Sequence, residues 1–147
     1  MTLLVPFDGS ELSTAALERA REFAAFRDAD IVVLTLVPDA PEYARDRGWL
    51  DPGDTFDVGV IERKLRQRVD DLAPDAEYRC ELIENVDPVA TETTDIARRI
   101  REVAAEVDAS IVFVGSENAG RVSSPLTSVG SPVAESAGYD VFIVRHA

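Results

Sequence analysis

Five short runs of apolar residues alternate with amphipathic segments along the chain, and this alternation constrains the fold more than any other feature. One run, Ile31–Val37, is apolar almost throughout, as is typical of a central parallel strand covered on both faces. Strands that alternate with helices in this way form βαβ units. The 147 residues therefore predict an α/β fold, a single doubly wound domain over residues 1–147 with a five-stranded parallel sheet and helices on both faces. The predicted strands are Leu3–Phe7, Ile31–Val37, the stretch around Tyr78, Cys80 and Leu82, Ser110–Val114, and Val141–Val144.

Apolar residues at helical spacing mark the segments between these strands. They predict helices over residues 11–26, 58–72 and 94–107 and a short helix over 132–137. The connection from Pro38 to Asp54 contains three prolines and is expected to be a loop with room for a short helical turn. The third predicted strand alternates between apolar and polar residues, which is typical of a strand near a sheet edge. Cys80 falls on its apolar phase, so a buried, unreactive thiol is expected rather than a redox centre.

The charge balance excludes some classes of function. Asp and Glu number 28 against 15 Lys and Arg, a formal net charge of −13, and this predicts no concentrated basic surface for nucleic acid. An acidic surface with a single lysine, Lys64, is typical of proteins in concentrated salt, so the composition favours a halophile over an ordinary acidic mesophilic protein. No apolar run approaches the roughly 18 residues that span a membrane. A cytoplasmic location is expected, because no signal-like segment is present and the lone Cys80 cannot form an internal disulfide.

The stretch Gly115–Ser131, GSENAGRVSSPLTSVGS, lies between the fourth predicted strand and the predicted short helix. Glycine-rich turns and helix N-termini favour anions there, because their backbone N–H groups are unpaired. The stretch is not a Walker loop, since Arg121 and Val122 stand where lysine and a hydroxyl are needed. The first strand is not followed by G-x-G-x-x-G, and the chain has no G-x-S-x-G elbow. One Cys and one His cannot build a structural zinc site, so neither catalytic nor metal-binding residues are expected.

Three residues follow or end predicted strands at their carboxyl ends: Asp8, Val37 and Gly115. In doubly wound sheets, ligands bind at these ends, where the strand order reverses. The three residues converge on one crevice if the first and fourth strands are neighbours. Asp8 has two open interpretations: its carboxylate accepts hydrogen bonds from sugar hydroxyls, or it completes the turn that caps the next helix.

Several stretches together resemble the universal stress protein (UspA-like) family. Leu4–Ser10 is similar to that family's opening strand and turn, Asp108–Ser116 to its fourth strand and glycine loop, and Tyr139–Arg145 to its closing strand. ATP-binding members carry G-x2-G-x9-G-[ST]. This chain has Gly115, four residues, Gly120, nine residues, Gly130 and Ser131, so the short spacing is longer by two residues and the long spacing is kept. Pro132, which follows, has no N–H to offer a phosphate.

The resemblance implies a sheet of the adenine nucleotide alpha hydrolase-like kind, ATP with magnesium as the ligand, and a homodimer. Together with the composition, it points to a halophilic archaeon as the source. In ATP-binding members, the residue matching Asp8 holds the ribose, the one matching Val37 lies by the adenine, and glycines wrap the phosphates. Arg121 either pairs with a phosphate or is a solvated loop residue. The dimer would pair through the last strand, Val141, Phe142, Ile143 and Val144. The phosphates would lie against Gly115, Gly120, Gly130 and Ser131.

Three functions from different classes remain open. The first is an ATP-binding stress-response or regulatory protein with little or no hydrolysis. The second is a dimeric interaction module of the same family that no longer binds nucleotide, which the longer loop and Pro132 favour. The third is an enzyme acting on a nucleotide or a phosphorylated metabolite, for which the sequence offers no nucleophile, general base or metal cluster. A protein that is not an enzyme is therefore expected.

Overall fold

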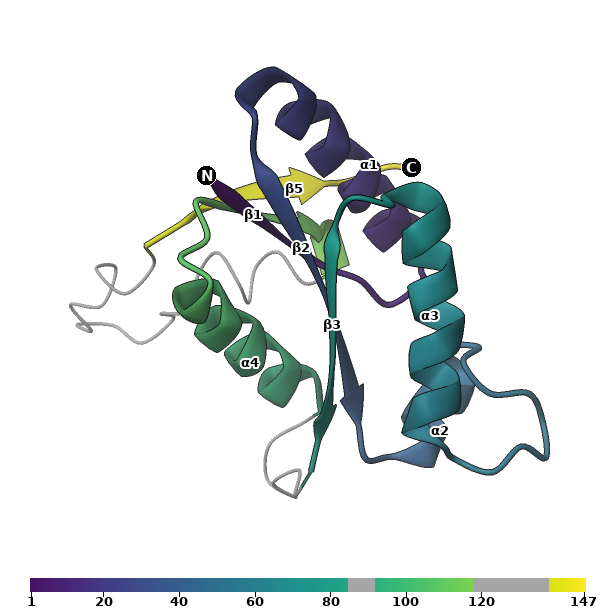
Figure 1. Cartoon of the computed structure of the whole chain (residues 1–147). Helices are drawn as coiled ribbons and strands as arrows, with labels where there is room; N and C mark the ends of the chain where they lie inside the picture. The colour runs from purple at the N-terminus through teal and green to yellow at the C-terminus, as the bar shows by residue number, and fades with distance from the viewer. Residues whose placement is uncertain (85–91, 118–137) are drawn as a thin grey trace, which may run out of the picture.

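A computed structural model describes residues 1–84, 92–117 and 138–147. The described strands form one sheet, all of whose recorded pairings are parallel, in the order β3-β2-β1-β4-β5 (Figure 1). This confirms the predicted five-stranded parallel sheet. The predicted short helix over 132–137 lies outside the described residues. The elements are β1 (Thr2–Pro6), α1 (Glu11–Arg27), β2 (Asp30–Pro38), α2 (Pro41–Asp46), α3 (Val58–Leu72), β3 (Glu77–Ile83), α4 (Glu92–Glu106), β4 (Ile111–Gly115) and β5 (Asp140–Val144).

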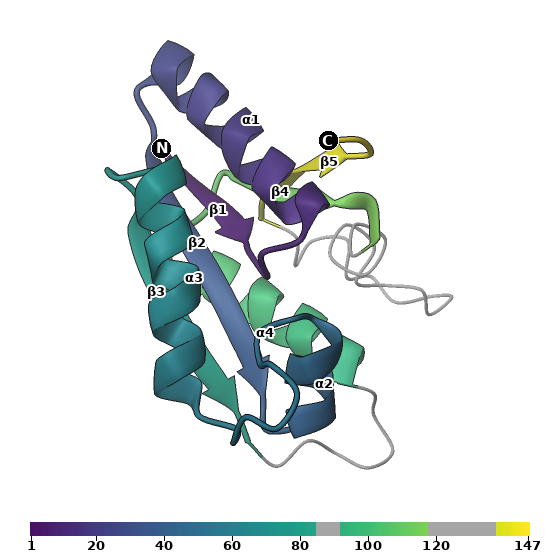
Figure 2. The same ribbon diagram turned by 90° about the vertical axis from the view of Figure 1, so that its right-hand side faces the viewer.

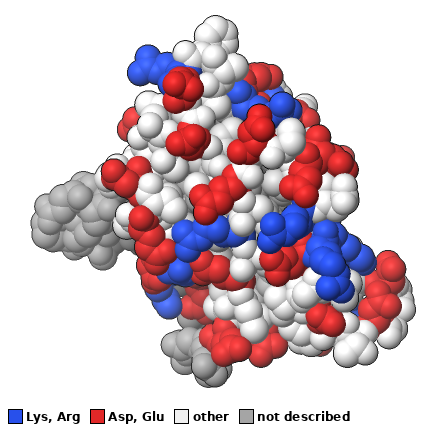
Figure 3. Space-filling view, in the orientation of Figure 1, with Lys and Arg blue, Asp and Glu red and all other residues white. Residues whose placement is uncertain are grey.

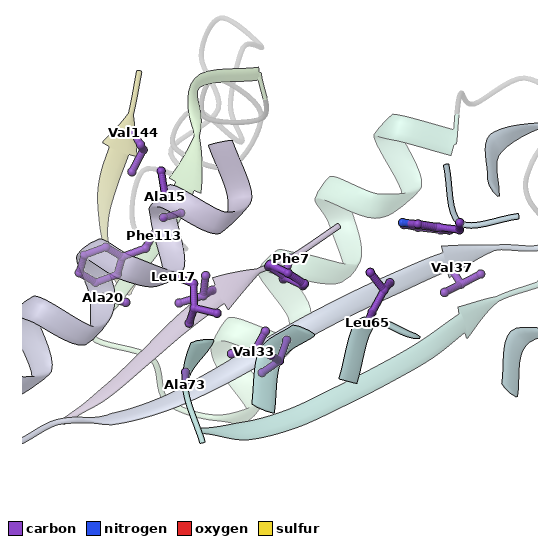
Figure 4. Packing of buried hydrophobic residues seen from close by; sticks show 14 of the residues in the cluster. Phe7, Ala15, Leu17, Ala20, Val33, Val37, Leu65, Ala73, Phe113 and Val144 are labelled. Carbon is purple, nitrogen blue, oxygen red and sulfur yellow. The ribbon is translucent and has the colours of Figure 1, made fainter. Parts of the chain in front are cut away.

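Alternation of side chains along the central strands gives the sheet two apolar faces, each covered by helices. On one face, Leu3, Val5 and Val33 pack with α1 and α3 (Figures 1 and 4). On the other face, Leu4 and Val32 pack with α4. The central strands are therefore buried on both sides, as their continuous apolar runs predict.

The strand order reverses at β1. This strand pairs with β2 on one side and with β4 on the other, where Leu4 lies opposite Val112. The carboxyl ends of β1 and β4 are consequently neighbours, and this is the condition under which Asp8 and Gly115 were expected to border one crevice.

The edge strand β3 is protected by charge. Arg79 and Glu81 from the strand form a network of ion pairs with Arg99 and Glu106 of α4. Charged side chains on an edge discourage pairing with another chain. Figure 3 views the surface in the orientation of Figure 1. On the face that it shows, acidic side chains are spread throughout, and basic side chains gather mainly in a band across it. Within β3, Cys80 is half-buried rather than fully buried as expected, and this partial burial raises the pKa of its thiol to about 11, in keeping with an unreactive cysteine.

The connection after β2 is more ordered than the sequence suggests. It contains the six-residue helix α2, which begins with Pro41 and lies at the end of the molecule where β2 ends (Figure 2). Proline suits the first position of a helix, because the N–H it lacks would have no partner there.

Candidate functional site

A cleft opens at the point where the strand order reverses. It has about 620 Å³ of space between atoms, part of it open to solvent. Clefts at the carboxyl ends of parallel strands are where α/β sheets bind ligands. The residues lining it come from the ends of β1, β2 and β4, the first turn of α1, and α2 and α4: Pro6, Phe7, Asp8, Ser10, Leu12, Ser13, Leu34, Leu36, Tyr43, Ile96, Ile100, Val114, Gly115 and Glu117.

Asp8 lies directly after β1 and is held at all of its polar groups. Its N–H donates to Ser13 Oγ at 3.3 Å, and its Oδ1 accepts from the Ser10 N–H at 2.9 Å. Its Oδ2 accepts from Arg47 Nη1 at 3.1 Å, and its main-chain carbonyl accepts from Trp49 Nε1 at 2.8 Å. The side chain is nevertheless 24% exposed and lines the cleft, so a carboxylate of fixed orientation faces any ligand there.

The turn after β1 uses two side chains to start α1. Ser10 is the residue that caps the helix, since its Oγ accepts from the Ser13 N–H at 3.2 Å. The Asp8 carboxylate in turn accepts from the Ser10 N–H. The two sequence interpretations of Asp8 are therefore compatible: it completes the capping turn, and one part of its carboxylate still faces the cleft.

The Asp8 carboxyl is held in its ionised form. Burial alone would raise its pKa, but interactions with Ser10 and Ser13 and the positive charge of Arg47 outweigh burial, and the pKa lies below its ordinary value. An ionised carboxylate has no proton to donate. At neutral pH this carboxylate can therefore accept hydrogen bonds but not donate them.

Arg47 and Trp49, from the connection after β2, are site residues that the sequence patterns did not predict. The Arg47 guanidinium also lies over the Tyr43 ring, 4.3 Å from its centroid, and the Tyr43 and Trp49 rings are 5.8 Å apart. Trp49 is 4% exposed. The available sequence signal was the occurrence of two aromatic residues, Tyr43 and Trp49, in a proline-rich connection. Large aromatic side chains are highly buried on average, so such a connection is expected to pack against the rest of the protein.

Val37 does not line the cleft with its side chain. That side chain is fully buried in the core layer on the α3 side of the sheet, with Leu65 and Phe7 (Figure 4). The backbone N–H and C=O groups of Val37 also point away from the cleft, toward β3. Asp39 donates its N–H to Ile83 of β3, and odd-numbered residues in this part of β2 share that direction, Val37 included.

Leu36 is the β2 residue that reaches the cleft. Its side chain lines the cleft, and its backbone groups point the same way as those of Leu34, whose carbonyl accepts from the Phe7 N–H. β1 ends at Pro6, which pairs with Leu34, so Leu36 lies beyond the end of β1. Its backbone therefore faces the space that opens where β1 stops.

Gly115 ends β4 and lines the cleft as expected. A Cβ at this position would lie 2.9 Å from the Cβ of Leu12 on α1, which is closer than side-chain atoms pack. The approach of α1 to β4 thus requires a glycine here, whatever the cleft binds. Gly120, Arg121, Gly130 and Ser131 lie outside the described residues.

One wall of the cleft is apolar. Leu36, Ile96 and Ile100 are each less than one-tenth exposed, and they contribute side chains from β2 and α4. A flat heterocyclic ring gains free energy on such a wall by leaving water. The cleft thus combines an apolar wall with an ionised carboxylate.

Within residues 1–84, 92–117 and 138–147, no group of three His, Cys, Asp or Glu side chains is placed to hold a metal ion. No helix in those ranges is both long enough and apolar enough to cross a membrane.

Comparison with known proteins gives a family match over nearly the whole chain. A sequence model of the universal stress protein family matches residues 1–145. Among solved structures, a universal stress protein in complex with cAMP is 28% identical, with a TM-score of 0.56, over 100% of this chain and 98% of the other.

Two further structures of the same family are more distant in sequence. A family member from Burkholderia pseudomallei is 21% identical with a TM-score of 0.59, over 97% of this chain and 94% of the other. The universal stress protein from Archaeoglobus fulgidus in complex with dAMP is 22% identical with a TM-score of 0.54, over 99% and 98%. At these identities the likeness concerns the fold alone. Because the family model matches residues 1–145, the chain belongs to the universal stress protein family.

Proposed function

We propose that this chain binds an adenine nucleotide in the cleft and acts as a stress-response or regulatory protein with little or no hydrolysis. The observation that carries the proposal is the placement of Asp8 and Gly115 at the ends of neighbouring strands, on one cleft with an apolar wall. The 28% identical relative that was crystallised with cAMP supports a nucleotide as the ligand class. Here ATP is the proposed ligand, and magnesium enters as its counter-ion.

Each part of the nucleotide has a matching region. The ribose hydroxyls would donate to the Asp8 carboxylate, which is fixed and ionised. The adenine would lie on the apolar wall and hydrogen bond to the backbone of Leu36 beyond the end of β1. The phosphates would extend past Gly115, where the chain enters the stretch whose glycine spacing resembles that of ATP-binding members.

Little hydrolysis is proposed because the described cleft offers poor general bases. Its described lining includes two carboxylates, Asp8 and Glu117. Asp8 has a lowered pKa and both oxygens already accept hydrogen bonds, so it would hold a proton weakly. Nucleotide would accordingly act as a ligand rather than as a substrate.

A homodimer through β5 is part of the proposal. β5 lies at the edge of the sheet and exposes apolar side chains, with Phe142 42% and Ile143 36% exposed. An unpaired edge strand offers backbone groups that can pair with a second copy. The Phe142 ring also stacks on the buried Phe113 at 4.9 Å, so a partner on this edge would extend the core.

A second candidate function is an interaction module of the same family that does not bind nucleotide. The contact between Gly115 and Leu12 favours it, because that glycine is explained by packing alone. The exposed apolar residues of β5 would then be the functional surface.

Equilibrium dialysis with labelled ATP and magnesium in concentrated KCl separates these functions. The nucleotide-binding proposal expects saturable binding below millimolar concentration, weakened about 10-fold or more by Asp8→Asn, because a hydrogen bond to a charged group is lost. Asp70→Asn, an exposed residue of α3, is the matched control and should bind like the parent. Absence of saturable binding below millimolar concentration would overturn the proposal in favour of the interaction module.

A further inference from the structure

The hydrogen-bond ladder between β1 and β2 ends with a side chain in place of a backbone donor. Its last residue pair is Pro6 with Leu34, and the Phe7 N–H still donates to the Leu34 carbonyl at 2.8 Å. In a parallel ladder, the next bond would run from the Leu36 N–H to the Phe7 carbonyl. Among the described residues that bond is not formed, and the Phe7 carbonyl accepts from Thr35 Oγ1 at 2.7 Å instead.

Thr35 is the one hydroxyl residue of β2 and is fully buried. A hydroxyl costs free energy in the core unless it has a hydrogen-bond partner, and the Phe7 carbonyl is that partner. Valine has nearly the same shape, suits a strand as well and needs no partner. The strand itself therefore does not require the hydroxyl, and the effect of the hydroxyl is on the Phe7 carbonyl.

The turn that follows is held away from β2 in the same manner. The Asp8 carbonyl accepts from Trp49 Nε1 at 2.8 Å, and the Gly9 carbonyl accepts from Arg68 Nη1 at 2.8 Å. With Phe7, three successive carbonyls are held by side chains from β2, from the connection after it and from α3. Together these bonds fix the path on which the chain leaves the sheet.

The Leu36 N–H is left facing the cleft. Leu36 is buried and lines the cleft, and its backbone points to the side where β1 has stopped. Within the part of the chain that the structure describes, this N–H has no acceptor. Buried N–H groups are nearly always paired, so a ligand with an acceptor atom at this position would gain affinity. The ring nitrogens of a purine are such acceptors.

We propose that Thr35 is a positioning residue, whose hydroxyl holds the Phe7 carbonyl and so keeps the Leu36 N–H free for the base of a bound nucleotide. This inference rests on the proposed nucleotide function and deepens it by naming the residue that keeps the donor open. Without the hydroxyl, the buried Phe7 carbonyl would take the next donor of the ladder, the Leu36 N–H. Thr35→Val should therefore extend the ladder by one bond and close the position to a ligand.

Amide hydrogen exchange without nucleotide, followed by NMR, tests the structural step. In the parent, the Leu36 amide should exchange at least about 10-fold faster than the Leu34 amide, which lies in the paired part of the ladder. In Thr35→Val the two rates should agree within about 3-fold, because both amides are then bonded. Thr35→Ser, which keeps the hydroxyl, should retain the parent's difference.

Calorimetric titration with ATP and magnesium in concentrated KCl tests the use of this donor. Thr35→Val should weaken ATP binding by about 10-fold or more, and Thr35→Ser by about 3-fold or less. Thr14→Val is the matched control, because it removes a buried hydroxyl of α1 that bonds to no described group. It should leave both the exchange of Leu36 and the affinity for ATP unchanged.

The outcomes separate this inference from the function on which it rests. Equal exchange of Leu36 and Leu34 in the parent, or a difference that survives Thr35→Val, overturns the role of Thr35 and leaves nucleotide binding standing. Undiminished ATP binding by a Thr35→Val variant with a protected Leu36 amide overturns the use of this donor for the base. Failure of the parent to bind ATP, with exchange as expected, overturns the proposed function and leaves the effect of Thr35 on the ladder intact.

Discussion

The indole N–H of Trp49 donates a hydrogen bond of 2.8 Å to the main-chain carbonyl of Asp8. The two residues are 41 positions apart, and this bond joins the connection after β2 to the turn after β1. The Trp49 carbonyl accepts from Lys64 Nζ of α3 at 3.2 Å. One side of the cleft is thus fastened both to β1 and to a helix that covers the sheet.

Trp49→Phe should destabilise the protein by about 1–3 kcal/mol, because it leaves the Asp8 carbonyl without its donor and removes buried ring surface. Urea unfolding followed by circular dichroism measures this, since the substitution removes the chain's one tryptophan. Phe26→Leu, at a side chain 89% exposed, is the control and should change stability by less than about 0.5 kcal/mol. A Trp49→Phe variant as stable as the parent would contradict the anchoring role.

Gly115→Ala should destabilise the unliganded protein by about 1–3 kcal/mol, because the new methyl group would lie 2.9 Å from the Leu12 Cβ and force α1 away from β4. Thermal unfolding without nucleotide measures the effect. Gly138→Ala is a matched control, since a Cβ there would meet no atom of the described residues within 4 Å. Equal stability of the two variants would show that α1 and β4 have more room than described.

Phe142→Asp should convert the proposed dimer to a monomer at micromolar concentration, because a charge would be buried without a partner at the β5 edge. Light scattering coupled to size-exclusion chromatography measures the mass. Phe26→Asp, on the exposed end of α1, should leave the mass unchanged. If the parent is already monomeric, or the variant remains dimeric, pairing through β5 is wrong.

The ion pairs of Glu81 are expected to make part of the protein's folding stability depend on pH. Its carboxylate accepts from Arg99 Nε at 2.6 Å and from Arg79 Nη2 at 3.0 Å, and these arginines hold its pKa below the usual 4.5. A lowered native pKa means that the stabilisation is present above about pH 4.5 and is lost as the pH falls through the native pKa. Glu81→Gln should therefore cost about 1 kcal/mol at neutral pH and progressively less below pH 4.5.

Urea unfolding of the parent and Glu81→Gln between pH 7 and pH 3 measures that difference. Glu18→Gln, an exposed residue of α1, should show no comparable dependence. A difference between parent and Glu81→Gln that stays constant over the whole range would contradict the assignment to this carboxylate.

The sheet could be predicted because central parallel strands must be apolar on both faces. A continuous apolar run such as Ile31–Val37 is typical of a strand in that position. The helix predicted over residues 58–72 agrees with α3, Val58–Leu72. Strand order lies outside such patterns, because it depends on which strands pair. The adjacency of β1 and β4, on which the whole cleft depends, came from the structure.

The residues that line the cleft were predicted only in part, for reasons that differ by residue. Asp8 and Gly115 follow from their places at strand ends, and both line the cleft. Val37 shows the limit of that reasoning, because one step along a strand reverses the direction of both side chain and backbone, and Leu36 faces the cleft instead. Arg47 acts across 39 positions from a connection with no periodic pattern, so sequence spacing carries no sign of its contact with Asp8.

The most direct test of nucleotide binding at this cleft uses Trp49 as a reporter. The chain has one tryptophan, so a ¹⁵N-labelled sample gives a single indole N–H signal, and that N–H bonds to Asp8 itself. Titration with ATP and magnesium in concentrated KCl should shift this signal saturably below millimolar concentration in the parent, with a markedly weaker response in Asp8→Asn. An indole signal that stays unchanged up to several millimolar ATP would contradict the account.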